Sequence, residues 1–211
     1  MNIINTGFSF SSALVKRTKT VGVVLHHAAA EKCTVQDIHR WHLNNGWAGI
    51  GYHFFVRKDG SIYSGRPIDV IGAHTYGAND ETIGICFEGN YEKETMPEAQ
   101  KNAGAALVSY VLAIYPGIKV SKHKDHNATA CPGKNFPFDY ISKGTVKQEV
   151  SKTEGTLYQV NNETVIKDPT GVTHTGKGVF TIVETMTIGE ANYGKLKSGI
   201  GWIRLDNAKK V

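Results

Sequence analysis

The strongest constraint on the fold of this chain is a change of pattern near residue 150. Before it, short β-branched runs alternate with stretches of helical periodicity; after it, strand-like runs are broken by Gly, Asn and Pro and helical periodicity is absent. Alternating strands and helices are typical of an α/β domain, and closely spaced short strands are typical of a small all-β barrel. The sequence therefore predicts an α/β domain over residues 1–145, a polar linker over 146–155 and a barrel-like all-β domain over 156–211.

Local signals place the elements of the first domain. The run TVGVVLHH at 20–27 predicts a buried strand that ends in two histidines. Thr34 suits a helix N-cap, and Gly46 suits the left-handed position that ends the same helix. Asp59-Gly60 predicts a two-residue hairpin turn. Residues 95–98 have capping-box spacing, and the apolar residues behind them predict a helix that packs one face on a sheet. Two further short strands are predicted at 82–89 and 117–120.

The cysteines and the first residues bear on where the protein is made. Cys33, Cys86 and Cys131 are too few, and odd in number, for a disulfide framework, which favours a reducing compartment or a metal-ligand role. The N-terminal segment lacks a basic stretch before an apolar core, so no secretory signal peptide is recognised. We therefore expect synthesis in a cytoplasm.

The charge and hydropathy patterns exclude several classes of partner. The formal net charge is +5, but its cations are spread along the chain, and nucleic-acid binding requires a denser basic patch. No apolar run approaches the roughly 18 residues that a membrane span needs. We therefore expect no nucleic-acid partner and no membrane insertion, and no feature of the sequence indicates an obligate protein partner. A long-range attraction to an anionic surface stays open.

Three residues form a candidate metal-ligand set. His26 stands at the carboxyl end of the predicted strand, and His123 and Cys131 lie eight residues apart in HKDHNATACPG. Two imidazoles and a thiolate suit Zn²⁺, and three protein ligands leave a fourth position for water, as in catalytic zinc sites. A histidine at a strand end is nevertheless often only a hydrogen-bonded structural residue, and Cys131 also suits a small buried position. From spacing alone, both interpretations stay open.

Longer stretches of the first domain resemble a known family. They are LHHAAA, WHLNNGWAGIGYHFFVRKDGSIYSGRP, GAHTYGANDETIGICFEGNY and HKDHNATACPG, in this order between about residues 20 and 140. Together they resemble the type 2 N-acetylmuramoyl-L-alanine amidases, a family that includes amidase-type phage lysozymes and peptidoglycan recognition proteins. The resemblance implies a central mixed β-sheet flanked by helices, a Zn²⁺ cofactor, and bacterial cell-wall peptidoglycan as the partner.

Taken position by position, the resemblance assigns the residues of the reaction centre. His26, His123 and Cys131 match the zinc ligands of the family, and Tyr52 of GYHF matches its catalytic tyrosine. Thr129 stands where members carry either a lysine or a threonine that assists catalysis. A lysine would bring a positive charge to the developing oxyanion, and the threonine of this chain does not supply that contribution.

Four more residues match positions that line the substrate groove in family members: His42, Trp47, His74 and Asn79. Each also has a structural interpretation, Trp47 as a core residue and His42 as part of the outer face of a helix. The resemblance therefore predicts substrate contacts at these positions, while their residue types alone do not decide between the two roles.

Three neighbouring polar residues are given other roles. His27 follows a ligand on a strand, so its side chain should point to the opposite face and is interpreted as structural. His126 is the alternative to His123 as a ligand, but the eight-residue spacing to Cys131 favours His123. Glu88 matches no catalytic position of the family and is not assigned as the general base, a role that stays open.

The C-terminal segment also resembles a known module. The stretch KLKSGIGWI at 195–203 is similar to bacterial SH3-like domains, which anchor lytic enzymes to cell walls. The preceding half of the segment departs from their usual pattern, which leaves the recognition loops undefined. We predict an SH3-like wall-binding domain over residues 156–211, with the reservation that a fold does not by itself establish binding.

The combined expectation is a zinc-dependent hydrolase that cuts the amide between N-acetylmuramic acid and L-alanine in peptidoglycan. The missing signal peptide fits a phage endolysin that causes host lysis, made in the host cytoplasm and acting on the cell wall after release. The alternative is a peptidoglycan-binding protein of the same fold without catalysis. Non-catalytic relatives typically lack the cysteine ligand, so Cys131 favours the enzyme.

Overall fold

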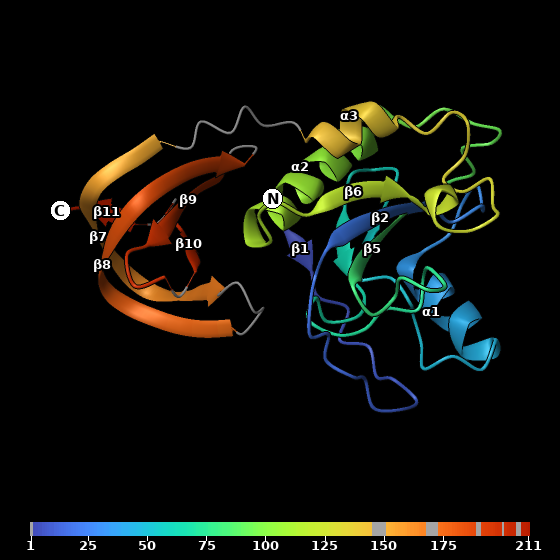
Figure 1. Cartoon of the computed structure of the whole chain (residues 1–211), viewed down its shortest axis with the longest axis horizontal. Helices are drawn as coiled ribbons and strands as arrows, with labels where there is room; N and C mark the ends of the chain where they lie inside the picture. The colour runs from blue at the N-terminus through green and yellow to red at the C-terminus, as the bar shows by residue number, and fades with distance from the viewer. Residues whose placement is uncertain (1, 145–150, 168–172, 189–190, 200, 206–207) are drawn as a thin grey trace. The chain divides into compact units, whose positions relative to one another are not determined.

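The computed structural model describes residues 2–144, 151–167, 173–188, 191–199, 201–205 and 208–211, which form two separate sheets (Figure 1). The chain divides into two compact units. The larger unit comprises residues 2–108 and 117–144 and contains a six-stranded sheet, and the second unit contains a five-stranded sheet. Within the described residues, no helix combines the length and apolar character that crossing a membrane requires.

The sheet of the larger unit is mixed, as predicted. Its strands lie in the order β1-β4-β3-β5-β2-β6. The four strands from β3 to β6 in this order are mutually parallel, and β4 pairs with β3 in the antiparallel sense. The bounds are β1 (Ile3–Ile4), β2 (Gly22–His27), β3 (Phe54–Val56), β4 (Ile62–Ser64), β5 (Thr82–Phe87) and β6 (Lys119–Lys122).

Strands β2 and β5 lie at the centre of this sheet, and every residue of both is buried. Parallel strands that are covered on both faces read as continuous apolar runs, which accounts for their compositions. His26 and Phe55 both pair with Cys86, so these three side chains share one face of the sheet. His27 pairs with Phe87 and lies on the opposite face, as the alternation of a strand requires.

Helix α1 (Val35–Asn44) begins and ends where the sequence predicts. The hydroxyl of Thr34 accepts a hydrogen bond from the Asp37 backbone N–H at 3.1 Å, and the Asp37 carboxylate accepts one from the Thr34 N–H at 2.9 Å. This reciprocal capping box satisfies two backbone donors at the start of the helix. At the other end Gly46 has φ +78°, the left-handed conformation that favours glycine.

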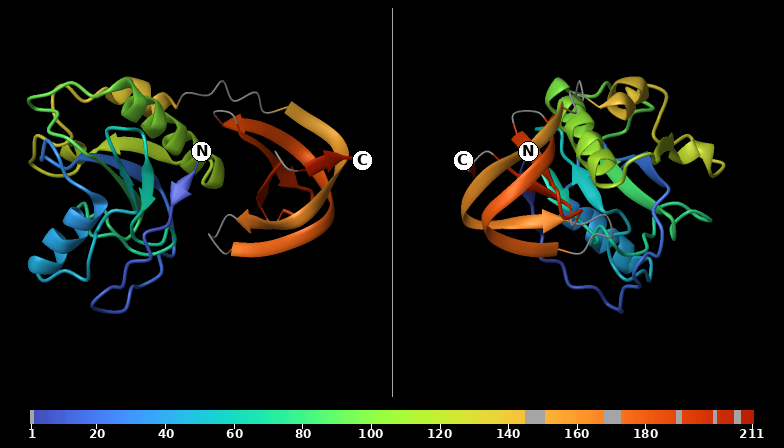
Figure 2. Two further views of the ribbon diagram at one scale, coloured as in Figure 1. Left: turned by 180° about the vertical axis from the view of Figure 1, so that it is seen from behind. Right: turned by 60° about the vertical axis from the view of Figure 1, so that its left-hand side comes forward.

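Helices cover both faces of the sheet. α1 lies on the face that carries His26, whereas α2 (Glu98–Ile114) and α3 (Phe138–Lys143) lie on the other face (Figures 1 and 2). A Cβ at Gly104 of α2 would come within 2.4 Å of the Phe87 ring, so the glycine allows this helix to approach the sheet closely. The core on the α1 side consists of Cys33, Val35, Ile38, Ile50, Phe55 and Cys86.

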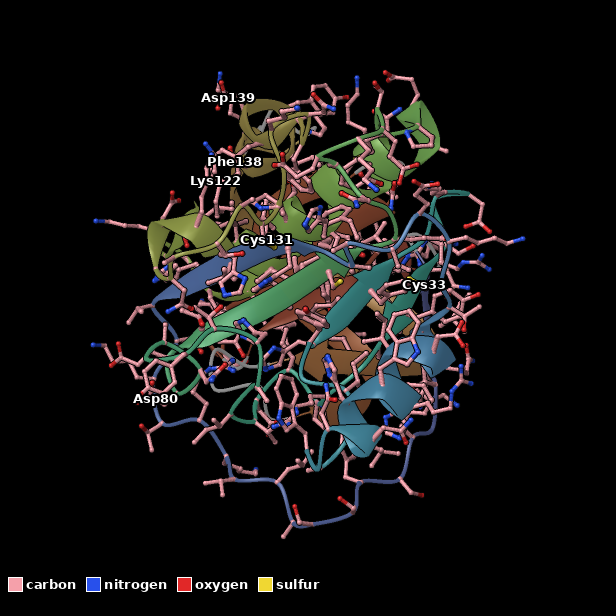
Figure 3. The ribbon with its side chains drawn as sticks, turned by 90° about the vertical axis from the view of Figure 1, so that its right-hand side faces the viewer. Cys33, Asp80, Lys122, Cys131, Phe138 and Asp139 are labelled. Carbon is pink, nitrogen blue, oxygen red and sulfur yellow. The ribbon has the colours of Figure 1, made fainter. Side chains whose placement is uncertain are left out.

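The short helix α3 (Phe138–Lys143) was not predicted. It buries Ile141, and its Phe138 ring lies 4.5 Å from the Lys122 ammonium at the end of β6 (Figure 3). A helix of six residues with one buried side chain has too little periodicity to be recognised from its residues alone.

Two local predictions differ from the structure in detail. The Arg57 carbonyl accepts a hydrogen bond from Gly60 N–H, and the Arg57 N–H donates to the Ser61 carbonyl, each at 2.9 Å. The β3–β4 turn is therefore longer than the predicted two-residue turn, with Gly60 at φ +88° closing it. Strand β6 begins at Lys119 rather than at residue 117, because Gly117 at φ +82° belongs to the preceding turn.

The five-stranded sheet of the second unit has the strand order β10-β9-β8-β7-β11. β10 also pairs with β7, so the sheet closes on itself around the apolar residues Val160, Ile182, Leu196, Ile203 and Leu205. β7 begins at Ser151, inside the segment predicted as a linker, of which residues 146–150 lie outside the described part of the chain. The bounds are β7 (Ser151–Lys167), β8 (Thr173–Ile188), β9 (Ala191–Leu196), β10 (Trp202–Arg204) and β11 (Ala208–Lys210).

Candidate functional site

The candidate site lies at the edge of the sheet where parallel strands end. β2 ends at His26-His27, and β6 pairs with it in parallel, with Leu25 opposite Lys122. His26, near the end of β2, and His123, directly after β6, therefore lie at the carboxyl ends of neighbouring parallel strands. Functional residues are commonly found at this end of parallel strands. The centroids of their rings are 4.5 Å apart.

Cys131 reaches this edge on the loop that follows the short helix η1 (His123–Asp125) (Figure 3). The Lys124 N–H donates to the Cys131 carbonyl at 2.9 Å, which closes the loop. The His27 backbone N–H donates to Cys131 Sγ at 3.4 Å, and Sγ lies 3.8 Å from His26 Nδ1. The thiol is thereby directed toward the first histidine.

The three candidate ligands are close enough to share one ion. Ligand atoms of His26, His123 and Cys131 all lie within 4.8 Å of one another. Around a tetrahedral zinc with nitrogen at about 2.1 Å and sulfur at about 2.3 Å, neighbouring donor atoms are roughly 3.5 Å apart. The separation of 3.8 Å between Cys131 Sγ and His26 Nδ1 approaches that value. Both the distances and the donor types fit zinc, although zinc binding itself stays a prediction.

Burial sets the protonation of these groups. It lowers the pKa of His26 well below the ordinary histidine value, with smaller contributions from neighbouring histidines, and it also lowers the pKa of His123. Both imidazoles are therefore neutral at pH 7, the form that binds metals. Burial raises the pKa of the Cys131 thiol to about 11, so zinc uptake near neutral pH would release this proton.

Tyr52 lies beside this cluster, with its ring centroid 5.1 Å from that of His26. Burial raises the pKa of its hydroxyl well above the ordinary tyrosine value, so the group keeps its proton and can donate a hydrogen bond. Thr129 is exposed, and its hydroxyl accepts a hydrogen bond from the Cys131 N–H at 3.2 Å. Tyr52 is thus near His26 in space, and Thr129 is near Cys131 along the chain and is hydrogen-bonded to its backbone.

An aromatic row connects the surface to the candidate ligands. Trp47 is 44% exposed, so it is not the core residue that its type also allowed. Its ring centroid is 4.6 Å from that of His42, which in turn is 5.5 Å from Tyr52. The Gly51 N–H donates to His42 Nδ1 at 2.9 Å, and burial lowers the pKa of His42 to about 4. Trp47 thus lies at the surface, with His42 between it and Tyr52.

His74 and Asn79, also predicted as substrate contacts, hold positions behind the ligands. His74 is only 7% exposed, and its Nδ1 lies 3.1 Å from His26 Nε2. Burial lowers the pKa of His74 to about 3, which keeps the imidazole neutral. The Asn79 side-chain oxygen accepts hydrogen bonds from the backbone N–H groups of His74 and Thr75 at 2.7 and 2.8 Å. Their contacts are with the protein itself.

The side chains of the remaining polar candidates have hydrogen-bond partners other than the three candidate ligands. Glu88 is 2% exposed and accepts hydrogen bonds from Arg57 Nε–H and from the N–H groups of Cys33 and Lys58. The Tyr91 N–H donates to His27 Nδ1 at 3.1 Å, and His126 Nε2 lies 2.8 Å from the Ser121 hydroxyl. These contacts agree with structural roles for all three residues.

One residue near the site was missed in the sequence. The side-chain oxygen of Asn127 lies 3.0 Å from His123 Nε2, and its amide group donates to the Tyr76 carbonyl at 3.1 Å. Asn127 follows His123 by four residues through a helical turn, and this spacing was the signal available in the sequence.

Comparison with known proteins places most of the larger unit in a family. Residues 16–134 match the family described as N-acetylmuramoyl-L-alanine amidase. Peptidoglycan-recognition protein SC2 of Drosophila melanogaster is 37% identical over 125 residues, covering 54% of this chain and 68% of the relative. The endolysin of Klebsiella phage KP32 is 34% identical over 126 residues, covering 56% of this chain and 83% of the relative.

A solved structure shows the same arrangement of elements. The N-acetylmuramoyl-L-alanine amidase LysC from Clostridium intestinale URNW has a TM-score of 0.65 and 38% sequence identity, and the match covers 67% of this chain and 95% of that one. The family match at residues 16–134 spans more than half of the chain and includes all three candidate ligands. The chain belongs to the N-acetylmuramoyl-L-alanine amidase family.

Proposed function

We propose that the protein is a zinc-dependent amidase that cleaves the bond between the lactyl group of N-acetylmuramic acid and the L-alanine of the stem peptide in bacterial peptidoglycan. The observation that carries this proposal is the convergence of His26, His123 and Cys131, with their ligand atoms within 4.8 Å of one another, beside a protonated tyrosine. The amidase family and the endolysin relative support the same activity.

The residues of this chain divide the work as follows. His26, His123 and Cys131 would hold the zinc, which when bound polarises a carbonyl and lowers the pKa of a bound water to about 7. The Tyr52 hydroxyl, kept protonated by burial, donates a hydrogen bond to the oxygen that gains negative charge as the amide is attacked. The Thr129 hydroxyl provides a second polar contact from the loop of Cys131. Trp47 and His42 would line the path of the substrate from the surface.

A binding protein of the same fold is the second candidate, because the matched relatives include a peptidoglycan-recognition protein. The complete set of two imidazoles and a thiolate favours hydrolysis, since binding alone does not need three metal ligands with a free fourth position. The endolysin relative also makes a role in lysis of a bacterial host the setting we propose, with the protein acting on the wall after release from the host cytoplasm.

Digestion of purified cell walls tests the activity directly. The expected products are free stem peptides with new N-terminal alanine and glycan strands without new reducing ends, identified by mass spectrometry. The matched variant is Tyr52→Phe, which keeps the ring beside His26 and removes the hydroxyl. Loss of one oxyanion donor should lower kcat by about 100- to 1000-fold without loss of zinc. Wall binding without any product would instead establish the binding protein.

The second unit is proposed to be an SH3-like wall-binding domain. Its closed all-β sheet and the stretch KLKSGIGWI support this proposal. A tethered enzyme experiences a higher effective concentration of its substrate. Removal of residues 150–211 is therefore expected to weaken pelleting with cell walls far more than it slows hydrolysis of a soluble muropeptide. Unchanged pelleting of the shortened protein would count against the anchoring role.

A further inference from the structure

The two predicted histidine ligands share a feature on the side away from the metal position. In each, Nε2 contacts a polar group that is attached to the same segment, residues 72–80, which we call the 72–80 loop. His26 contacts the side chain of His74 in this loop, and His123 contacts Asn127, whose amide group holds the backbone of Tyr76. These contacts determine which ring nitrogen is free for a metal.

For His26, the contacts select one tautomer. His74 Nε2 lies 3.4 Å from the Thr82 carbonyl, which can only accept a hydrogen bond, so the proton of the neutral His74 ring resides on Nε2. His74 Nδ1 is then an acceptor, and it lies 3.1 Å from His26 Nε2. The Thr75 hydroxyl lies 2.9 Å from His74 Nδ1 and 3.3 Å from His26 Nε2, and it can donate its proton to only one of them. Without a proton on His26 Nε2, the two ring nitrogens would face each other with lone pairs, so the His26 proton is assigned to Nε2, where His74 Nδ1 or the Thr75 hydroxyl accepts it. This leaves the lone pair on Nδ1, the atom that lies 3.8 Å from Cys131 Sγ.

For His123, the same argument runs through Asn127. The Asn127 amide nitrogen lies 3.1 Å from the Tyr76 carbonyl and 3.0 Å from the His126 carbonyl, both of which are acceptors. The side-chain oxygen consequently faces His123 Nε2, at 3.0 Å. An oxygen of this kind only accepts, so the His123 proton also resides on Nε2 and the lone pair on Nδ1.

The fold makes room for the first of these contacts. A Cβ at Gly72 or Gly84 would come within 2.4 or 2.5 Å of the His74 ring, so both positions require glycine for the ring to lie between them. At the base of the loop, a Cβ at Gly51 would lie 1.9 Å from the Ala73 carbonyl oxygen. Asn79 accepts hydrogen bonds from two backbone N–H groups of the loop and fixes its course. The His74 ring is thus held in place from several sides.

We propose that His74 and Asn127 are positioning residues, which hold His26 and His123 as the Nε2–H tautomers with both Nδ1 atoms directed toward the metal. Hydrogen bonds to the second nitrogen of a metal-binding histidine fix its orientation in the same way in many metal sites. The inference rests on the proposed zinc site. It gives His74 and Asn79, predicted from the sequence as substrate contacts, a role in building the site.

Zinc affinity of the full-length protein, measured by competition with a chelator, tests Asn127 first. Asn127→Leu keeps the volume but removes the acceptor, and it should weaken zinc binding by about 10-fold or more. Asn127→Asp keeps an acceptor for His123 Nε2–H but loses the amide donor to the Tyr76 and His126 carbonyls, so it should bind zinc more tightly than Asn127→Leu and less tightly than the parent. His126→Ala is the matched control. It removes an imidazole from the same loop, and this imidazole contacts the Ser121 hydroxyl and not a candidate ligand. Its zinc affinity should equal that of the parent.

His74→Phe tests the other half of the proposal. The substitution keeps a planar ring in the buried position and removes the nearer of the two acceptors for His26 Nε2–H, leaving the Thr75 hydroxyl at 3.3 Å. It should weaken zinc binding by about 10-fold. Thermal unfolding measured alongside shows whether the variant is folded. Since Asn127 is only half-buried, the Asn127→Leu result decides the proposal if His74→Phe does not fold.

A spectroscopic signature separates this role from a merely structural one. In the protein loaded with ¹¹³Cd and labelled with ¹⁵N, scalar coupling to the metal is expected at Nδ1 of both His26 and His123, with the proton on Nε2. Coupling to Nε2 of either histidine would overturn the proposal, as would Asn127→Leu with the zinc affinity of the parent. In both cases zinc binding and the proposed amidase activity stand. A parent protein that binds neither metal would overturn the proposed function together with this inference.

Discussion

Replacing Cys131 with alanine is expected to remove zinc from the protein and to abolish the release of stem peptides from cell walls. Cys131 would provide the thiolate of the proposed ligand set, and its Sγ lies within 4.8 Å of ligand atoms of both histidines. Only the two imidazoles would remain, so the site would lose the negative charge of the thiolate and one of its three protein ligands. Zinc content by mass spectrometry under native conditions and product analysis of digested walls measure the two effects.

Cys33→Ala is the matched control for this experiment. Cys33 is also a buried cysteine, 3% exposed, but it belongs to the core on the α1 side. Its removal should cost some stability through lost packing while zinc content and peptide release persist. A Cys131→Ala protein that retained one zinc per chain and digested walls as fast as the parent would show that the metal site is elsewhere.

Replacing Glu88 with alanine should lower the free energy of unfolding by about 3 kcal/mol, because it leaves a partly buried guanidinium and two backbone N–H groups without their acceptor. The Glu88 side chain is 3% exposed and lies 3.1 Å from Arg57 Nε. Hydrogen bonding to this carboxylate raises the pKa of Arg57, which agrees with a pair stabilised in its charged form. Urea unfolding followed by circular dichroism measures the change.

The same variant distinguishes a structural carboxylate from a general base. Because Glu88 accepts its hydrogen bonds from Arg57, Cys33 and Lys58, the folded fraction of Glu88→Ala should hydrolyse a soluble muropeptide at the parental rate. Glu98→Ala serves as the control: its carboxylate is 74% exposed and pairs with Lys101, and such surface pairs contribute about 0–1 kcal/mol. A large loss of kcat with unchanged stability would make Glu88 the base.

The fold was predicted best where a local rule decides it. Thr34 and Gly46 mark the ends of α1 because capping and the left-handed conformation depend on a few neighbouring atoms. The two-residue strand β1 (Ile3–Ile4) was missed because its pairing with β4 joins residues that are distant in the sequence. Such pairing depends on how the chain folds back, and a short segment carries too few residues to show a pattern.

For the candidate site, the sequence predicted the ligand set but not the contacts behind it. The resemblance to a family identified His26, His123 and Cys131, and the structure brings them together. The same resemblance predicts a substrate contact at His74, and the structure adds a contact that the sequence did not reveal, between His74 Nδ1 and His26 Nε2. Residue type and spacing do not reveal the burial of a loop side chain. The His74 ring can be buried because Gly84, on strand β5, has no side chain that would clash with it.

The distance along the chain between the predicted ligands also has a consequence for biosynthesis. His26 and Cys131 are 105 residues apart, and they meet only through the parallel pairing of β2 with β6 and the loop beyond it. A ribosome-bound fragment that ends before this loop therefore lacks the complete ligand set, however long zinc is present. Zinc would then bind late in synthesis, after the domain that carries all three ligands has folded. Because zinc would bind only this folded domain, its binding free energy would add to the free energy of global unfolding.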